Sequence, residues 1–146
     1  MPRFLFDTGV FIYALGGEHP YREPCRAILR DVQAKRLAAE ASVELIHEFA
    51  HVRLRQVKRR VDATRSARAI ARSFSLHTVE PPDMERALEL WSEHDRLDVR
   101  DAIFAAQALN RGIDAILSPD GDFDGIVGLR RIDPADAASV ASLRTT

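Results

Sequence analysis

The sequence predicts an α/β domain built on a central, mostly parallel sheet. Short apolar runs typical of buried strands alternate with segments whose apolar residues recur every three or four positions, as on one face of a helix. The chain has 146 residues, 46% of them hydrophobic, which suits a single domain over residues 1–146 with a substantial core. Carboxylates follow several of the apolar runs. That edge of an open α/β sheet is where binding crevices form.

The first expected elements are a buried strand at residues 3–7 and a helix from Pro20 to Lys35, whose apolar residues fall at helical spacing. A short strand is expected at residues 37–41. Ser42 then provides an N-cap for a helix that runs to about Lys58.

The middle of the chain is expected to hold one more helix and a strand. The helix begins at Asp62 or Thr64 and ends near Phe74. The strand covers residues 77–79 and ends at Pro81-Pro82, because proline cannot donate a backbone hydrogen bond.

Two further helices follow. Asp83 is expected to cap a helix that ends near His94. Asp98 is expected to cap the next helix, with Asp101 three residues on in a capping-box-like arrangement, and Gly112 closes it.

The last elements are a strand at residues 115–117, a turn over 118–124 and a strand at 128–132. Right-handed crossovers between parallel strands bring the carboxyl ends of the strands to one edge. Asp7 and Asp120 are therefore expected to lie near each other.

Composition limits the class of protein. Cys25 is the only cysteine, so an internal disulfide and a cysteine-rich zinc site are excluded, which fits a reducing cytoplasm. No stretch approaches about 18 consecutive apolar residues, so no membrane span is predicted. The formal net charge of −1 points to no particular partner.

Acidic residues at the predicted sheet edge indicate a metal site. Clustered carboxylates repel one another unless a cation lies between them, and hard oxygen ligands suit Mg²⁺ or Mn²⁺. Such a site supports phosphoryl transfer, so a metal-dependent nuclease is the first hypothesis. The acids in question are Asp7, Glu48, Asp101, Asp120, Asp122 and Asp124.

A basic stretch over residues 53–72 has only Asp62 to oppose it. Such a stretch is often a solvated helix face, but the lack of balancing acids favours contact with RNA phosphates. The residues expected to contact RNA are Arg53, Arg55, Lys58, Arg59 and Arg60.

Four segments follow one another along the chain: Phe6-Asp7-Thr8, Ser42 with Glu48-Phe49, Asp101-Ala-Ile-Phe-Ala-Ala106 and Ile116-Leu-Ser-Pro-Asp120-Gly-Asp-Phe123. Through these segments the chain resembles a PIN domain, and specifically a VapC-type toxin ribonuclease of a bacterial toxin–antitoxin pair. The resemblance implies a three-layer αβα sandwich, a Mg²⁺- or Mn²⁺-dependent endoribonuclease, a homodimer and inhibition by a small VapB-like antitoxin. Carried over by position, it implies an acidic quartet of Asp7, Glu48, Asp101 and Asp120, and a Ser or Thr at Ser118.

Spare polar residues near these segments leave the ligand set open. Asp98 is favoured as a helix cap and Asp101 as a ligand, and Asp120 ranks first in its turn because it follows the strand most closely. The possible secondary site residues are Asp98, Asp122, Asp124, Glu44, Ser118 and Thr8.

Two alternatives stand beside the nuclease. His47-Glu48-Phe-Ala-His51 matches the H-E-x-x-H motif of zinc metallopeptidases, although residues 52–76 hold no His or Glu as a third ligand. The other alternative is a PIN-like module that binds a protein partner and has no activity.

Overall fold

The computed structural model describes residues 1–144 and contains a fully parallel sheet with the strand order β3-β2-β1-β4-β5. This arrangement confirms the predicted α/β class. In this part of the chain the strands are β1 (Arg3–Phe6), β2 (Ala38–Ser42), β3 (Leu76–His77), β4 (Ala115–Leu117) and β5 (Arg130–Ile132).

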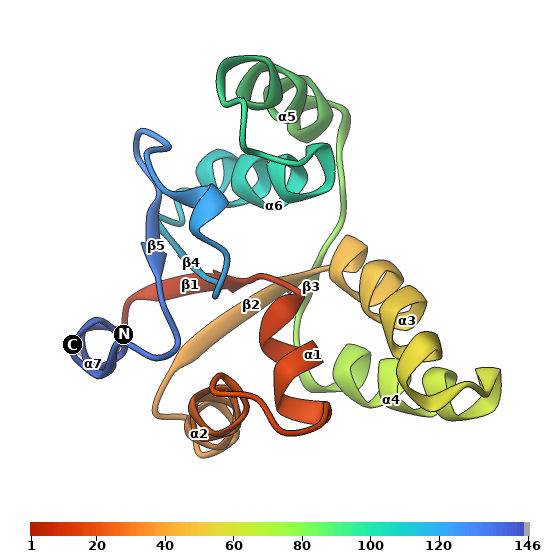
Figure 1. The fold of residues 1–146 in the computed structure, drawn as a ribbon. Helices are drawn as coiled ribbons and strands as arrows, with labels where there is room; N and C mark the ends of the chain where they lie inside the picture. The colour runs from red at the N-terminus through yellow and green to blue at the C-terminus, as the bar shows by residue number, and fades with distance from the viewer. Residues whose placement is uncertain (145–146) are drawn as a thin grey trace.

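Helices cover both faces of the sheet, with α5 and α6 on one side and α1 and α2 on the other, which gives the three-layer αβα sandwich (Figure 1). None of the helices in residues 1–144 is both long and apolar enough to cross a membrane. The helices are α1 (Gly9–Leu15), α2 (Arg22–Gln33), α3 (Val43–Val57), α4 (Arg60–Ser73), α5 (Pro81–Glu93), α6 (Val99–Asn110), α7 (Ala137–Ser142) and the short 3₁₀ helix η1 (Gly121–Phe123).

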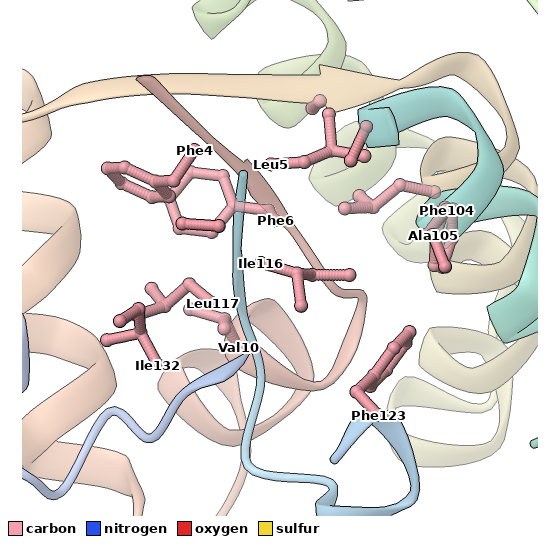
Figure 2. Close-up of a cluster of buried hydrophobic side chains, with 14 of the residues drawn as sticks. Phe4, Leu5, Phe6, Val10, Phe104, Ala105, Ile116, Leu117, Phe123 and Ile132 are labelled. Carbon is pink, nitrogen blue, oxygen red and sulfur yellow. The ribbon is translucent and has the colours of Figure 1, made fainter. Parts of the chain in front are cut away.

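Strand β1 is the centre of the core because both of its faces are buried. Phe4, Leu5 and Phe6 are each 0% exposed. Leu5 is in register with Ile116, and Phe6 with Leu117. Figure 2 shows Phe6 and Leu117 on one side of the sheet and Leu5 and Ile116 on the other. An apolar strand packed on both faces is typical of a parallel sheet, and its burial fixes the strand ends that carry polar side chains.

Two helices were missed by the sequence prediction. Helix α1 begins two residues after Asp7 and buries Val10, Phe11 and Ala14. Its β-branched and aromatic residues have only moderate helix propensity, so tertiary burial decides its conformation. Helix α7 is one short Ala-rich segment, capped by Asp136, whose side chain accepts a hydrogen bond from the Ser139 amide.

The predicted start of α5 was wrong. Asp83 does not cap the helix: Glu80 is the N-cap, and Pro81 and Pro82 occupy the first turn, where a missing N–H is harmless. Asp83 is instead the third helical residue, and its side chain accepts a hydrogen bond from the Glu80 amide at 2.9 Å. Similarly, α4 begins at Arg60 rather than at Asp62.

Candidate active site

An acidic pocket of about 610 Å³ opens where β1 and β4 end. The four acids predicted as the quartet come from the end of β1, the middle of α3, the first turn of α6 and the turn after β4, and all of them line this pocket. The carboxylates that line it are Asp7, Glu48, Asp98, Asp101, Asp120 and Asp122. The parallel sheet therefore brings together side chains that lie far apart in the sequence.

Asp7 is buried and held from both sides. One carboxylate oxygen accepts a hydrogen bond from the Thr8 amide at 2.8 Å, and the other accepts one from the Ser118 hydroxyl at 2.6 Å. The Ser118 oxygen also accepts from the Asp120 amide at 2.9 Å. Ser118 thus links the end of β1 to the turn after β4 and fixes two of the acids relative to each other.

Glu48 is oriented by Thr8, whose hydroxyl donates to its carboxylate at 2.9 Å. The helix that carries Glu48 is started by Ser42, which accepts from the Glu44 amide at 3.0 Å, as the sequence predicted. Thr8 and Ser118, both expected as secondary residues, therefore act on the acids through hydroxyl hydrogen bonds.

Burial and mutual repulsion make two of the acids hard to ionise. Burial raises the pKa of Asp7 to about 7, with the negative charges of Glu48 and Asp120 adding to the effect. Burial also raises the pKa of Asp101 to about 8, and the carboxylates of Asp7, Glu48 and Asp120 raise it further. Both carboxyls would ionise more readily if a cation lay among them.

The donor set suits a hard divalent cation, because it consists of carboxylate oxygens with Thr and Ser hydroxyls beside them. In residues 1–144 no three His, Cys, Asp or Glu side chains meet in a ready-made metal-binding group. The acids instead lie around the walls of the pocket.

The secondary acids divide into two groups. Asp98 and Asp122 line the pocket, whereas Glu44 and Asp124 do not. Asp98 caps α6, as predicted, by accepting a hydrogen bond from the Arg100 amide at 2.7 Å. Although burial opposes ionisation of Asp98, hydrogen bonds from Arg100 outweigh it and lower the pKa of this carboxyl. Asp124 instead pairs with Arg131 at 2.8 Å on the surface.

The basic residues predicted to contact RNA are not equivalent. Arg53 is partly buried and donates to the Leu15 carbonyl at 2.9 Å, so it ties α3 to the end of α1. Arg55 hydrogen-bonds to His51 at 3.0 Å. Lys58, Arg59 and Arg60 are exposed at the α3–α4 turn. A helical rise of 1.5 Å per residue places that turn roughly 15 Å beyond Glu48.

The sequence prediction missed several residues that line the pocket, among them Arg100 and Tyr13. The signal for Arg100 was its position between Asp98 and Asp101, in the first turn of a helix that begins at the site. Tyr13 gave no usable signal, because its contribution depends on α1, which the sequence did not predict.

The H-E-x-x-H motif does not form a metal site. His47 has a side chain that is 77% exposed and hydrogen-bonds to Glu44 at 2.9 Å. His51 is exposed beside Arg55, and neither histidine lines the pocket into which Glu48 projects.

Residues 4–129 match the family model of the PIN domain, and the chain belongs to that family. It is similar over 143 residues to ribonuclease VapC7 of Mycobacterium tuberculosis, with 36% identity covering 95% of this chain and 96% of the relative. Ribonuclease VapC23 of the same species is 33% identical over 119 residues, which cover 78% of this chain and 90% of the relative. The VapC resemblance inferred from the sequence is thereby confirmed.

Solved structures show the same fold. A toxin–antitoxin complex from Klebsiella pneumoniae aligns with a TM-score of 0.67 at 22% identity, covering 90% of this chain and 97% of that one. VapBC2 from Rickettsia felis, bound to a promoter DNA fragment, aligns with a TM-score of 0.69 at 15% identity, covering 89% and 97%.

Proposed function

We propose that this VapC-type ribonuclease toxin hydrolyses RNA phosphodiesters with Mg²⁺ or Mn²⁺ held by Asp7, Glu48, Asp101 and Asp120. The observation that carries the proposal is the convergence of these four carboxylates, from four separate segments, on one pocket. Burial and repulsion raise the pKa of two of them, so a divalent cation would be drawn to the site. The zinc peptidase and the inactive binding module leave this convergence unexplained.

In this mechanism the cation, when bound, lowers the pKa of a water and offsets negative charge at the phosphate. The chain's own residues position the acids. Thr8 orients Glu48, and Ser118 holds Asp7. The side chains of both carboxylates are therefore already oriented before a ligand binds. A pocket carboxylate accepts the proton of the attacking water. The RNA 2′-hydroxyl is then not needed as the nucleophile.

The test is cleavage of end-labelled structured RNA by purified, antitoxin-free protein with Mg²⁺, Mn²⁺, Zn²⁺ or EDTA. Asp101→Asn is compared with Asp95→Asn, an exposed aspartate outside the pocket. We expect cleavage with Mg²⁺ or Mn²⁺ that is lost in Asp101→Asn and kept in Asp95→Asn. Full metal-dependent cleavage by Asp101→Asn would refute the ligand set.

The RNA path is proposed to run from the pocket towards Lys58, Arg59 and Arg60, the exposed basic residues at the α3–α4 turn. Contacts there would be to phosphates and would weaken with salt. Because the proposed substrate is cellular RNA, we place the protein in the bacterial cytoplasm.

A small VapB-like antitoxin is the proposed inhibitor, as in the toxin–antitoxin complexes that share the fold. We propose that the antitoxin binds in an apolar groove of about 460 Å³ between α1, α2 and α4. A Lys or Arg side chain of its tail would then enter the acidic pocket. Ala69→Glu introduces a charge into the groove. We expect it to lose co-purification with the co-expressed antitoxin and to keep RNA cleavage. The groove includes Phe11, Leu15, Leu29, Val32, Ile70 and Phe74.

A homodimer is proposed on the outer face of α5. Met84, Leu88 and Trp91 are 36%, 46% and 50% exposed and recur at helical spacing, which forms an apolar stripe suited to packing against its own copy. Leu88→Asp should convert the dimer to a monomer in sedimentation experiments. If wild type and Leu88→Asp sediment with the same mass, the outer face of α5 is not the dimer interface.

A further inference from the structure

The acidic pocket contains one cationic and one aromatic side chain among the residues that the structure describes, Arg100 from α6 and Tyr13 from α1. Six carboxylates share the same space. A nucleic-acid phosphate is repelled by these carboxylates, so its approach needs positive charge nearby. A cation held by the acids would supply part of that charge, and Arg100 is the basic side chain that lines the pocket.

Arg100 is available for a phosphate. Its side chain is 55% exposed, and its ion pair with Asp98 is long, with Nε and Oδ1 3.4 Å apart. The backbone amide of Arg100 makes the shorter bond to the same oxygen, so Asp98 remains satisfied if the guanidinium turns away. A guanidinium can bind a phosphate through two parallel hydrogen bonds.

Tyr13 is held in place by an aromatic cluster. Its ring stacks on His19 with centroids 4.3 Å apart and an interplanar angle of 27°, and it lies 5.5 Å from Tyr21. Tyr21 is anchored in turn by a hydrogen bond from its hydroxyl to Asp133 at 3.0 Å. The ring that lines the pocket is therefore ordered before any ligand arrives, which reduces the entropy lost on stacking.

We propose that Tyr13 and Arg100 form a nucleotide subsite beside the acids, in which an unpaired base stacks on Tyr13 and its phosphate contacts Arg100. A base can stack on a side chain only when it is splayed out of a helix, so the subsite selects unpaired nucleotides. This inference rests on the proposed ribonuclease function and adds the residues that hold the substrate.

The substrate for the test is a library of RNA hairpins with a randomised unpaired loop, so that no target sequence need be known. Arg100→Gln is compared with Arg86→Gln, which removes the same charge from α5 outside the pocket. We expect kcat/KM of Arg100→Gln to fall about ten- to a hundredfold, mainly through KM. The slope of log kcat/KM against log salt concentration should also become shallower by about 0.7 in Arg100→Gln. This is the change expected when one phosphate contact to a single strand is lost. Arg86→Gln should match wild type in both respects.

The base contact is tested by pairing protein variants with an abasic substrate. Tyr13→Phe keeps a ring, whereas Tyr13→Leu keeps only apolar volume. For the best-cleaved loop, we expect removal of one base next to the cut to reduce wild-type kcat/KM about 5- to 150-fold. The same removal should cost Tyr13→Leu nothing more, because the contact is already lost. The subsite would be overturned if the losses in kcat/KM from the abasic substrate and from Tyr13→Leu were additive. It would also be overturned if kcat/KM of Arg100→Gln depended on salt as strongly as that of wild type.

Failure of the subsite and failure of the proposed function give different results. If wild type cleaves the library with Mg²⁺ or Mn²⁺ and both Tyr13→Leu and Arg100→Gln behave like it, the nuclease stands and the subsite is wrong. If wild type cleaves no loop with either metal, the proposed function is wrong and the subsite falls with it.

Discussion

Replacing Asp101 with Asn should stabilise the metal-free protein. The pKa of this carboxyl rises from 3.8 to about 8 on folding, so the folded state retains a proton that the unfolded state gives up between those two pH values. Stability must therefore fall as pH rises from about 4 to about 8. At about 1.4 kcal/mol per pKa unit, the upper bound of the destabilisation above pH 8 is about 6 kcal/mol.

The measurable gain is smaller than this bound. Asp101 is only partly buried, so solvent screens part of its interaction with the other acids. Protonation of Asp101 also removes its repulsion with Asp7, so the same repulsion must not be counted once for each acid. We expect Asp101→Asn to gain about 1–3 kcal/mol at pH 8 in EDTA, which corresponds to roughly 2–4 °C in Tm per kcal/mol. The assay is urea and thermal unfolding from pH 5 to pH 9, with EDTA or excess Mg²⁺.

Asp98→Asn is the matched control, because it lies in the same helical turn and has a lowered pKa. Asn caps a helix about as well as Asp, so this variant should be unchanged or slightly less stable. Added Mg²⁺ should stabilise wild type and Asp98→Asn more than Asp101→Asn. A loss of stability in Asp101→Asn at pH 8 would show that the carboxylates do not repel one another as the structure indicates.

Three further outcomes are expected. Asp83→Asn should destabilise the fold by about 2–4 kcal/mol in urea unfolding, because the buried carboxylate pairs with Arg111 at 2.9 Å. The pKa of Asp83 is lowered to about 2 by Arg111, so this contribution should be lost in wild type as pH falls from about 4 to about 2. Ser118→Ala should reduce RNA cleavage and raise the Mg²⁺ concentration needed, because Asp7 loses a 2.6 Å donor. Phe6→Ala should cost about 3–5 kcal/mol by differential scanning calorimetry, since the ring is fully buried.

The fold class could be predicted because the buried strands carry their signal locally. Residues 4–6 and 115–117 are short apolar runs, and the alternation of such runs with helical segments predicts a mostly parallel sheet. Helix α1 could not be predicted in the same way. Val10, Phe11 and Ala14 lie at helical spacing, but a helix of 7 residues is too short for that spacing to predict it, so its conformation depends on packing against the core.

The acids of the site were recoverable from the sequence for a related reason. A strand end fixes the position of the residue that follows it, so Asp7 and Asp120 meet once the sheet is parallel. The Asp98 cap and the place of Asp101 in the pocket wall also follow from helix geometry, because a cap and a residue three positions on share a face. Side-chain partners between elements, such as Ser118 with Asp7, needed the three-dimensional structure.

Stability and function are opposed at this edge of the sheet. The core around β1 buries Phe4, Leu5 and Phe6 completely, and this burial offsets the cost of placing two hard-to-ionise carboxyls beside it. If the acids served only the fold, an apolar or amide side chain would serve it better. A carboxylate cluster in which burial and repulsion raise the pKa of two members therefore fits the cation and phosphate chemistry that we propose for the site.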